Sequence, residues 1–395
     1  MKDITYREGS EKIMIYFDNS ATTAMDSAVL ATYDQTAKRI IGNPSSLHKL
    51  GEEASLLLRK ARTQIAHLIG CQPNEIYFTS GGTEGDNWVL KGTAIEKREF
   101  GRHIIVSAIE HPAVLETAHQ LSQLGFDVEL APVTKEGVVN VEALASMIRK
   151  DTILVSVMAV NNEIGTIQPI EAISNLLEAY PNIHFHVDAV QAIGKIPTER
   201  YLTPRVDFAT FSAHKFHGPR GIGFMYWKTG RRLAPLLTGG GQESNERSGT
   251  ENVPAIVAEA RALRLLFEDA DKKQHYERQM IASLRDGLEK YDKVTIFTPN
   301  NDHITAPHIL CFGIEGVRGE VLVHALEEHD IYISTTSACS SRKHLPAGTL
   351  KAMGIPQSMV ETAVRISLDS YNKADELAKF MSVFNQLYQR FLKVN

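Results

Sequence analysis

The sequence predicts an α/β fold, in which a mostly parallel sheet of seven-stranded type carries helices on both faces and a smaller α+β domain follows. Apolar runs alternate with helical patterns between residues 75 and 227, the order that is typical of βα units. A segment without periodicity follows at 238–250. Beyond it, strands and helices no longer alternate, which indicates a second lobe with a different architecture.

The expected strands of the main sheet are short apolar runs that end at turn residues or at isolated polar residues. They are residues 75–79, 103–108, 128–133, 153–160, 183–188, 208–212 and 221–227. Between them, residues 54–69, 114–124 and 170–179 have apolar side chains three and four positions apart, which predicts amphipathic helices. Helices on both sides of the sheet would bury its two faces.

The second lobe is expected to begin with a charged helical region. After residues 259–290 the sequence predicts strands, a helix and a C-terminal helix; the strands are near 294–298, 307–312 and 332–334, and the first helix is at 319–328. We therefore expect a large domain at 16–262 and a small domain at 263–395. Residues 1–15 are expected to pack on the small domain.

Composition excludes several classes of protein. The chain has 395 residues, 43% of them hydrophobic and 23% charged, with a net charge of −5 and no basic stripe. Direct binding to nucleic acid is therefore not expected. The N-terminus lacks the pattern of a secretory signal, and the apolar run 153–160 is too short to cross a bilayer. We expect a cytoplasmic enzyme without membrane contact.

The three cysteines differ in their surroundings. Cys71 follows a predicted helix and Cys311 lies in an apolar strand, so both are expected to pack as small hydrophobic residues. Cys339 lies among small polar residues and is followed by the basic residues 342–344. Such a setting favours an accessible thiolate. Three cysteines without a Cys-x-x-Cys pair predict neither a disulfide framework nor a metal site.

Lys215 is the most informative residue. It lies in the mainly apolar stretch 211–219 without an acidic neighbour. A desolvated amine loses its proton readily and can hold an aldehyde as a Schiff base. Upstream, the alternating run 184–188 ends at Asp188, a carboxylate that could keep the pyridine nitrogen of pyridoxal phosphate protonated. A lone lysine after a strand is more often a solvated loop residue, so this pairing carries the hypothesis.

Two further features point to the same ligand. The strand 75–79 turns on two glycines, including Gly82, into a helix whose N-terminus would attract an anion, with Thr83 as a hydroxyl donor. A glycine turn of this kind can also be simple architecture. His111 follows the strand 103–108 at the carboxyl edge of the sheet, where α/β proteins bind ligands, and could stack on a ring and relay protons.

Metal binding is the weaker hypothesis for the histidines of the strand 183–188. His184 and His186 alternate with Asp188 and could face one way as metal ligands. No further cluster of ligands accompanies them, and buried histidines are common in strands. We therefore expect no metal site.

Together these pieces resemble the pyridoxal phosphate-dependent cysteine desulfurases of the NifS/IscS type, which are class V enzymes of fold type I. The resemblance covers residues 16–367 and rests on eight motifs in the same order. They are residues 16–23, 42–46, 80–84, 110–112, 161–165, 188–191, 212–215 and 247–250. The resemblance implies a transferase of fold type I with a bound pyridoxal phosphate.

The resemblance also assigns roles to matching positions. Lys215 would be the Schiff-base lysine, Asp188 the partner of the pyridine nitrogen and His111 the stacking and proton-relay group. The other cofactor contacts would be Gly82, Thr83, Ser212 and His214 around the phosphate, Gln191 at the ring hydroxyl, and Asn162. Thr250 would reach the phosphate from the neighbouring subunit of a homodimer. Asn43, Asn162 and Arg365 would bind the substrate, for which an arginine fork suits a carboxylate.

The implied reaction converts L-cysteine to L-alanine through a pyridoxal phosphate ketimine, with the sulfur captured as a persulfide on Cys339. The sulfur would pass to a protein acceptor for tRNA thiolation or iron–sulfur cluster assembly. Three departures put the acceptor in doubt: the loop 334–339 lacks the usual glycine, Asp369 and Ser370 replace the usual glycine-containing motif, and the chain ends at Asn395 without a longer tail. These features are similar to desulfurases that serve a ThiI-like partner.

Three alternatives remain open from the sequence. A selenocysteine lyase would use the same residues, and a class V aminotransferase would share Lys215 and Asp188 but needs no thiol such as Cys339. A non-catalytic scaffold could keep the fold without binding the cofactor. Persulfide formation separates a desulfurase from an aminotransferase, and absorption by bound cofactor separates any of these enzymes from a scaffold.

Overall fold

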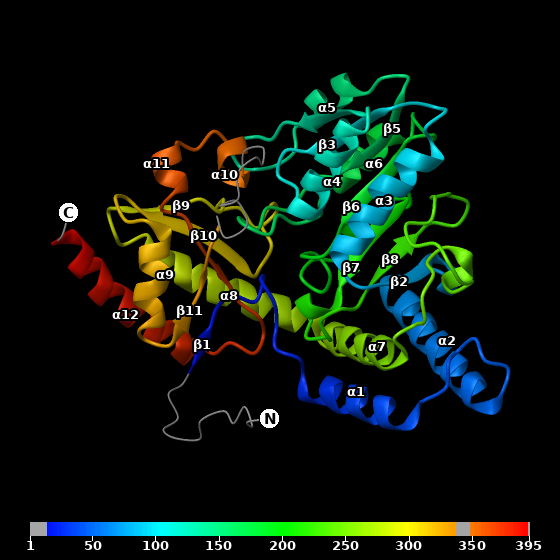
Figure 1. The fold of residues 1–395 in the computed structure, drawn as a ribbon. Helices are drawn as coiled ribbons and strands as arrows, with labels where there is room; N and C mark the ends of the chain where they lie inside the picture. The colour runs from blue at the N-terminus through cyan, green and yellow to red at the C-terminus, as the bar shows by residue number, and fades with distance from the viewer. Residues whose placement is uncertain (1–13, 337–347, 394–395) are drawn as a thin grey trace.

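The computed structural model describes residues 14–336 and 348–393, and within them a seven-stranded sheet forms the centre of the larger lobe (Figure 1). The strand order is β2-β8-β7-β6-β5-β3-β4. The strands are β2 (Ile76–Thr79), β3 (His103–Ser107), β4 (Asp127–Ala131), β5 (Thr152–Ser156), β6 (His184–Asp188), β7 (Phe208–Ser212) and β8 (Gly223–Trp227). Only β8 runs antiparallel to its neighbours, so the predicted, mostly parallel sheet is confirmed.

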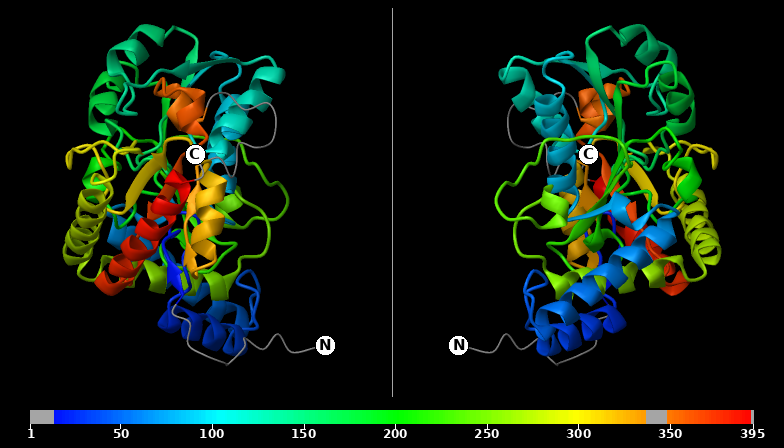
Figure 2. Two further views of the ribbon diagram at one scale, coloured as in Figure 1. Left: turned by 90° about the vertical axis from the view of Figure 1, so that its left-hand side faces the viewer. Right: turned by 90° about the vertical axis from the view of Figure 1, so that its right-hand side faces the viewer.

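Helices cover both faces of this sheet because its strand residues alternate between two apolar cores. Ile104 and Val106 face a core built with α3 and α4, whereas Ile105 faces the core that includes α2, α6 and α7. The helices of this lobe are α1 (Ser27–Arg39), α2 (Lys49–Ile69), α3 (Gly82–Glu96), α4 (Pro112–Gln123), α5 (Val141–Met147), α6 (Ile170–Leu177) and α7 (Val253–Phe267). Helices α1 and α2 pack on α7 at one end of the molecule (Figures 1 and 2).

Short 3-10 helices lie between some of these strands and helices. They are η1 (Pro73–Glu75), η2 (Thr198–Arg200), η3 (Ala213–Lys215) and η4 (Glu243–Asn245). η3 directly follows β7 and carries Lys215 to the carboxyl edge of the sheet. The tight turn after the strand thus places the lysine where α/β sheets bind ligands.

A four-stranded antiparallel sheet of order β12-β13-β10-β9 forms the smaller lobe, together with a two-stranded pair of β1 and β11. The strands are β1 (Ile15–Tyr16), β9 (Val294–Ile296), β10 (Ile309–Ile314), β11 (Ile331–Tyr332), β12 (Ser334–Thr335) and β13 (Val364–Ser367). The helices are α8 (Ala270–Leu288), α9 (Gly319–Glu327), α10 (Thr349–Ala352), α11 (Gln357–Val360) and α12 (Ala374–Leu392). The strand expected at 332–334 is thus two short strands.

The cores of the two lobes are separate clusters. Leu263 of α7 belongs to the core of the larger lobe, whereas Ile15 and Phe17 pack with Phe380 and Phe384 in the smaller lobe. The N-terminal segment that the structure describes therefore crosses from one lobe to the other. The domain boundaries at 16–262 and 263–395 stay a prediction. None of the helices in the described ranges has the length and apolar character needed to cross a membrane.

Candidate active site

A cavity of about 670 Å³ lies at the carboxyl edge of the seven-stranded sheet and extends to the smaller lobe. Ten of the residues singled out from the sequence line it: Gly82, Thr83, His111, Asn162, Asp188, Gln191, Ser212, His214, Lys215 and Arg365. Asn43 and Thr250 do not line it, and both are exposed on loops of the larger lobe. Cys339 lies outside the described residues.

The first wall is the start of α3, where the β2 strand turns on two glycines. Gly81 precedes the helix with a φ of 143°, and no side chain caps the helix. A Cβ atom at Gly82 would lie 2.8 Å from the Val190 side chain, so the close approach of the two segments requires a glycine. The first N–H groups of a helix have no partner within the helix, which makes this turn a site for an anion.

The floor of the cavity carries two buried carboxyl groups. Asp188 ends β6, its Oδ1 accepts a hydrogen bond of 2.9 Å from the Val190 N–H, and burial raises its pKa to about 6. Asp86 of α3 accepts a hydrogen bond of 2.6 Å from the Thr210 hydroxyl, and burial next to Asp188 raises its pKa well above the usual range. A cationic group beside Asp188 would stabilise its charge in this buried setting.

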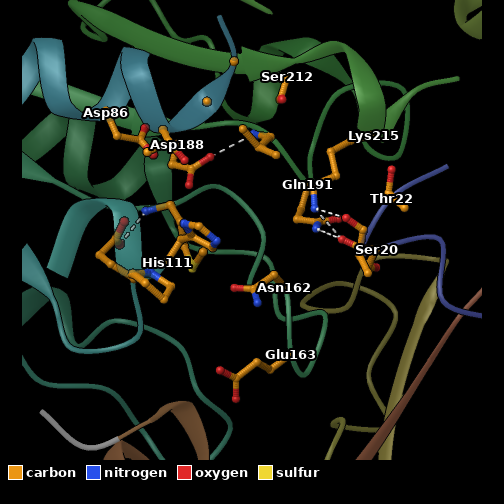
Figure 3. A pocket seen from close by; sticks show the side chains of 18 of the residues that line it. Ser20, Thr22, Asp86, His111, Asn162, Glu163, Asp188, Gln191, Ser212 and Lys215 are labelled. Carbon is orange, nitrogen blue, oxygen red and sulfur yellow. Dashed lines mark hydrogen bonds between the residues drawn. The ribbon is translucent and has the colours of Figure 1, made fainter. Parts of the chain in front are cut away.

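The Lys215 amine meets the N-terminal segment opposite this floor (Figure 3). Its Nζ donates to the carbonyl oxygens of Ser20 at 2.6 Å and Ala21 at 2.9 Å. The Gln191 amide donates to the same Ser20 oxygen at 3.0 Å, and its contact with the cofactor hydroxyl stays a prediction. The segment around Ser20 therefore forms the wall that holds both side chains.

Two histidines at this edge are held in the neutral form. His111 caps α4 by accepting a hydrogen bond of 3.1 Å from the Ala113 N–H at Nδ1, so the hydrogen of the neutral ring is on Nε2. Burial and the charge of Lys215 lower the pKa of His111 to about 4. The ring of His214 lies 3.1 Å from the Thr22 hydroxyl, and burial lowers its pKa to about 4 as well.

Arg365 enters the cavity from β13 of the smaller lobe. Its Nη1 donates to the Asn162 carbonyl at 2.7 Å, and its Nη2 donates to Asp18 Oδ1 at 2.8 Å. Its Nε is buried and has no hydrogen-bond partner among the described residues. A buried guanidinium with an unused donor is suited to an anionic ligand such as a carboxylate.

Besides Glu84 and Asp86 of α3, sequence reasoning missed the carboxyl groups of Glu110 and Glu163, which also line the cavity. Burial raises the pKa of Glu110 to about 8, and its Oε1 accepts hydrogen bonds from the Met158 N–H, at 2.7 Å, and from the Ser107 hydroxyl. Burial also raises the pKa of Glu163 to about 7. Glu110 adjoins His111 in sequence, and Glu163 adjoins Asn162. This adjacency to predicted site residues is the signal by which the sequence could have identified them.

The histidines weighed as metal ligands are engaged elsewhere. His184 Nδ1 lies 2.9 Å from the Thr93 hydroxyl and His186 Nδ1 lies 2.9 Å from the Ser156 hydroxyl. Burial lowers their pKa values to about 2 and about 3. Within residues 14–336 and 348–393 there is no group of three or more His, Cys, Asp or Glu side chains that could hold a metal ion.

Cys71 and Cys311 pack as predicted. Cys311 is fully buried in β10, and Cys71 is half-buried against the core of the larger lobe. Burial raises the pKa of both thiols, to about 12 for Cys71. Thiols with raised pKa values are poor nucleophiles.

Pyridoxal phosphate fits the walls of this cavity, group by group. The uncapped start of α3 suits its phosphate, the buried Asp188 suits a protonated ring nitrogen, and the amine of Lys215 suits its aldehyde. These groups come from three different elements but border one space (Figure 3). The cavity thus combines an anion site, a cation site and an amine.

Comparisons with known proteins agree with this geometry. The family model for "Aminotransferase class-V" matches residues 15–380. A "NifS/IcsS protein homolog" of Lactobacillus delbrueckii subsp. bulgaricus is 55% identical over 97% of this chain and 99% of its own length. A "Cysteine desulfurase IscS" of Methanosarcina thermophila is 39% identical over 96% of this chain and 93% of its own.

The fold matches solved structures as well. The structure of a "NIFS-LIKE PROTEIN" superposes with a TM-score of 0.89 at 40% sequence identity, and the match covers 97% of this chain and 100% of that one. The agreement spans both lobes, since the matched length includes nearly the whole chain. The chain therefore belongs to the class V aminotransferase family, as one of its pyridoxal phosphate-dependent cysteine desulfurases of the NifS/IscS type.

Proposed function

We propose that this enzyme takes the sulfur of L-cysteine onto Cys339, releases L-alanine, and passes the sulfur to a protein acceptor. The observation that carries the proposal is that Lys215, Asp188, the start of α3 and Arg365 border one cavity. Their separation across two lobes would let one amino acid be held at its amino end and at its carboxylate. The cofactor, when bound, supplies an electron sink for the carbon that loses a proton.

The protein groups supply positioning and proton transfer in this proposal. Arg365 holds the substrate carboxylate with its guanidinium group, and the Asn162 side chain, which lines the same space, assists it. Lys215 removes the α-proton, since its amine lies at the end of η3 inside the cavity. The neutral ring of His111 would lie over the ring of the cofactor, and its Nε2 hydrogen is available to donate a hydrogen bond.

Sulfur transfer is the step that needs Cys339. Its thiolate attacks the sulfur of the substrate, so that an S–S bond forms and the C–S bond breaks with its electron pair left on carbon. That carbon takes a proton and leaves as L-alanine. One thiol and one L-cysteine thus give one persulfide and one L-alanine, with no external oxidant or reductant.

The proposed enzyme is a cytoplasmic homodimer. Asn43 and Thr250 are exposed and do not line the cavity of their own subunit, which is compatible with their lining the cavity of a second subunit. In that arrangement Thr250 contacts the phosphate and Asn43 the substrate. Gel filtration with light scattering tests this, and a monomer that keeps full cofactor occupancy and activity would contradict it.

The acceptor is proposed to be a ThiI-like protein for tRNA thiolation or a scaffold for iron–sulfur cluster assembly. The two are separated by incubating the persulfide form, labelled with ³⁵S, with each purified acceptor. Transfer of label to one acceptor alone identifies the pathway. Label that stays on the enzyme with both would contradict both assignments.

The central experiment follows the fate of the substrate. The holoenzyme is incubated with L-cysteine, and alanine and the masses of cysteine-containing peptides are measured by mass spectrometry. We expect alanine together with a gain of one sulfur atom on Cys339, loss of both with Cys339→Ser, and retention of both with the control Cys71→Ser. Sulfur on Cys71 or Cys311 instead would contradict the role of Cys339. Amine exchange that requires a keto acid, without persulfide, would indicate an aminotransferase, and activity confined to selenocysteine would indicate a lyase.

A further inference from the structure

A buried ion pair joins the two lobes directly behind Lys215. His217, two residues after the lysine, belongs to the larger lobe, and Asp369, four residues after Arg365, belongs to the smaller one. His217 Nε2 lies 3.2 Å from Asp369 Oδ2. The side chains are 17% and 7% exposed, so water screens the pair poorly.

Both ring nitrogens of His217 face an oxygen that accepts hydrogen bonds. Nδ1 lies 2.9 Å from the carbonyl oxygen of Ala24, which can only accept a hydrogen bond. Nε2 faces the carboxylate of Asp369. An imidazolium ring at this position can donate a hydrogen bond to each of these two oxygens. Burial by itself would raise the pKa of Asp369, but the hydrogen bond and charge of His217 lower it, so the carboxyl is ionised.

The backbone at His217 is strained and is held in place by neighbours. Its φ of 62° lies in the left-handed region, which residues other than glycine adopt rarely and at an energetic cost. The His217 N–H donates to the Thr23 hydroxyl at 2.8 Å, and the ring packs edge-on against Tyr371 at 4.9 Å between centroids. The conformation that follows Lys215 is thus determined by contacts with segments far away in sequence.

Hydrogen bonds within the smaller lobe fix the position of Asp369. Its Oδ1 accepts a hydrogen bond of 2.8 Å from the Tyr371 N–H, and its own N–H donates to Asn372 Oδ1 at 3.0 Å. Asn372 in turn donates to the carbonyl oxygen of Tyr16 at 3.0 Å. Since β13 leads from Arg365 to this turn, a force on Asp369 acts on the strand that carries the arginine.

We propose that the His217–Asp369 pair is a positioning clamp that sets the spacing between Lys215 and Arg365 across the lobe boundary. The proposal rests on the function proposed above, in which these two residues hold the amino end and the carboxylate of one substrate. An amino acid has a fixed length between its two ends. The clamp lies within a few residues of both groups. It should therefore affect substrate affinity more strongly than it affects the rate of the chemistry at the cofactor.

The test replaces Asp369 with asparagine, which keeps the Oδ1 that accepts from the Tyr371 N–H but removes the charge. We expect KM for L-cysteine to rise about 3- to 10-fold, with kcat changed by less than about twofold. The visible absorption of the bound cofactor should stay unchanged. Asp369→Glu keeps the charge and should restore part of the affinity. If Asp369→Asn does not accumulate, His217→Gln removes the same pair from the other side.

The matched control removes a contact between the lobes that lies outside this cluster of charges. Arg200 Nη2 of the larger lobe donates a hydrogen bond of 2.9 Å to the carbonyl oxygen of His303, and neither residue adjoins Lys215 or Arg365 in sequence. Arg200→Ala should leave KM within about twofold of the wild-type value. Three results would overturn the proposal. The control could raise KM as much as Asp369→Asn does. Asp369→Asn could instead lower kcat and cofactor absorption at unchanged KM, or change nothing.

A binding measurement separates this proposal from the proposed function. The dissociation constant for L-alanine, obtained from the change in the cofactor spectrum on titration, needs no desulfuration. Weaker binding in Asp369→Asn and in His217→Gln, with little further loss in the double variant, supports the clamp. A wild-type enzyme that binds L-alanine but never forms a persulfide would contradict the proposed function and leave the clamp testable.

Discussion

Replacing Glu110 with glutamine should remove a pH-dependent loss of stability that is built into the wall of the cavity. Burial raises the pKa of the Glu110 carboxyl from its ordinary 4.5 to about 8 in the folded protein. Below pH 4.5 both folded and unfolded chains keep this proton, so the group has no effect on the pH dependence. Between pH 4.5 and 8 the unfolded chain releases the proton while the folded chain holds it, so stability falls as pH rises.

The size of the effect follows from the two pKa values. Each pKa unit corresponds to about 1.36 kcal/mol, so the difference between Glu110→Gln and the wild type should grow by several kcal/mol from pH 4.5 to pH 8. Glutamine can keep the Oε1 that accepts from the Met158 N–H at 2.7 Å. Its second amide hydrogen-bonding group lacks a partner, but that cost does not vary with pH.

The assay is denaturant-induced unfolding of both holoproteins at saturating cofactor from pH 5 to pH 9. Because cofactor binding varies with pH in both proteins, the difference between the two curves is the quantity of interest. Glu99→Gln, at an exposed position, is the control and should stay parallel to the wild type at every pH. A Glu110→Gln curve that also stays parallel would refute the reasoning.

Three other variants test the site. Lys215→Ala should abolish turnover and the visible absorption of lysine-linked cofactor while far-ultraviolet circular dichroism stays unchanged; normal absorption would exclude Lys215 as the anchor. Asp188→Asn should keep the cofactor, since Oδ1 can still accept from the Val190 N–H, but lower kcat at least about 100-fold because the electron sink weakens; an unchanged kcat would contradict the assignment. Arg365→Ala should raise KM for L-cysteine about 10- to 100-fold, because a charge-assisted contact contributes about 1.5–3 kcal/mol. Equal losses of cofactor affinity and substrate affinity would instead make Arg365 a structural residue.

Local periodicity made the larger lobe predictable. Each expected strand of the main sheet is present, with ends that differ by a few residues, because short apolar runs between turns mark buried parallel strands. Helices α1 and α5 were not expected. Buried positions are few in both, Val29 and Thr36 in α1 and Leu144 in α5, so their apolar faces are weak in sequence.

The sequence by itself determined which chemical groups lie at the strand ends that border the cavity. Asp188 ends β6 and Lys215 follows β7, and the carboxyl ends of neighbouring parallel strands must meet at one edge. The glycine turn before α3 is equally local. These assignments depend on strand direction and order, which alternating patterns reveal.

Only the tertiary structure decided which distant groups meet. Arg365 contacts Asp18 across 347 positions of the sequence, and His217 meets Asp369 across the lobe boundary. It also decided that Glu110 is buried in the wall and that Asn43 and Thr250 do not line the cavity. Such contacts leave no periodic pattern, because they arise from the packing of one lobe on the other rather than from any local run of residues.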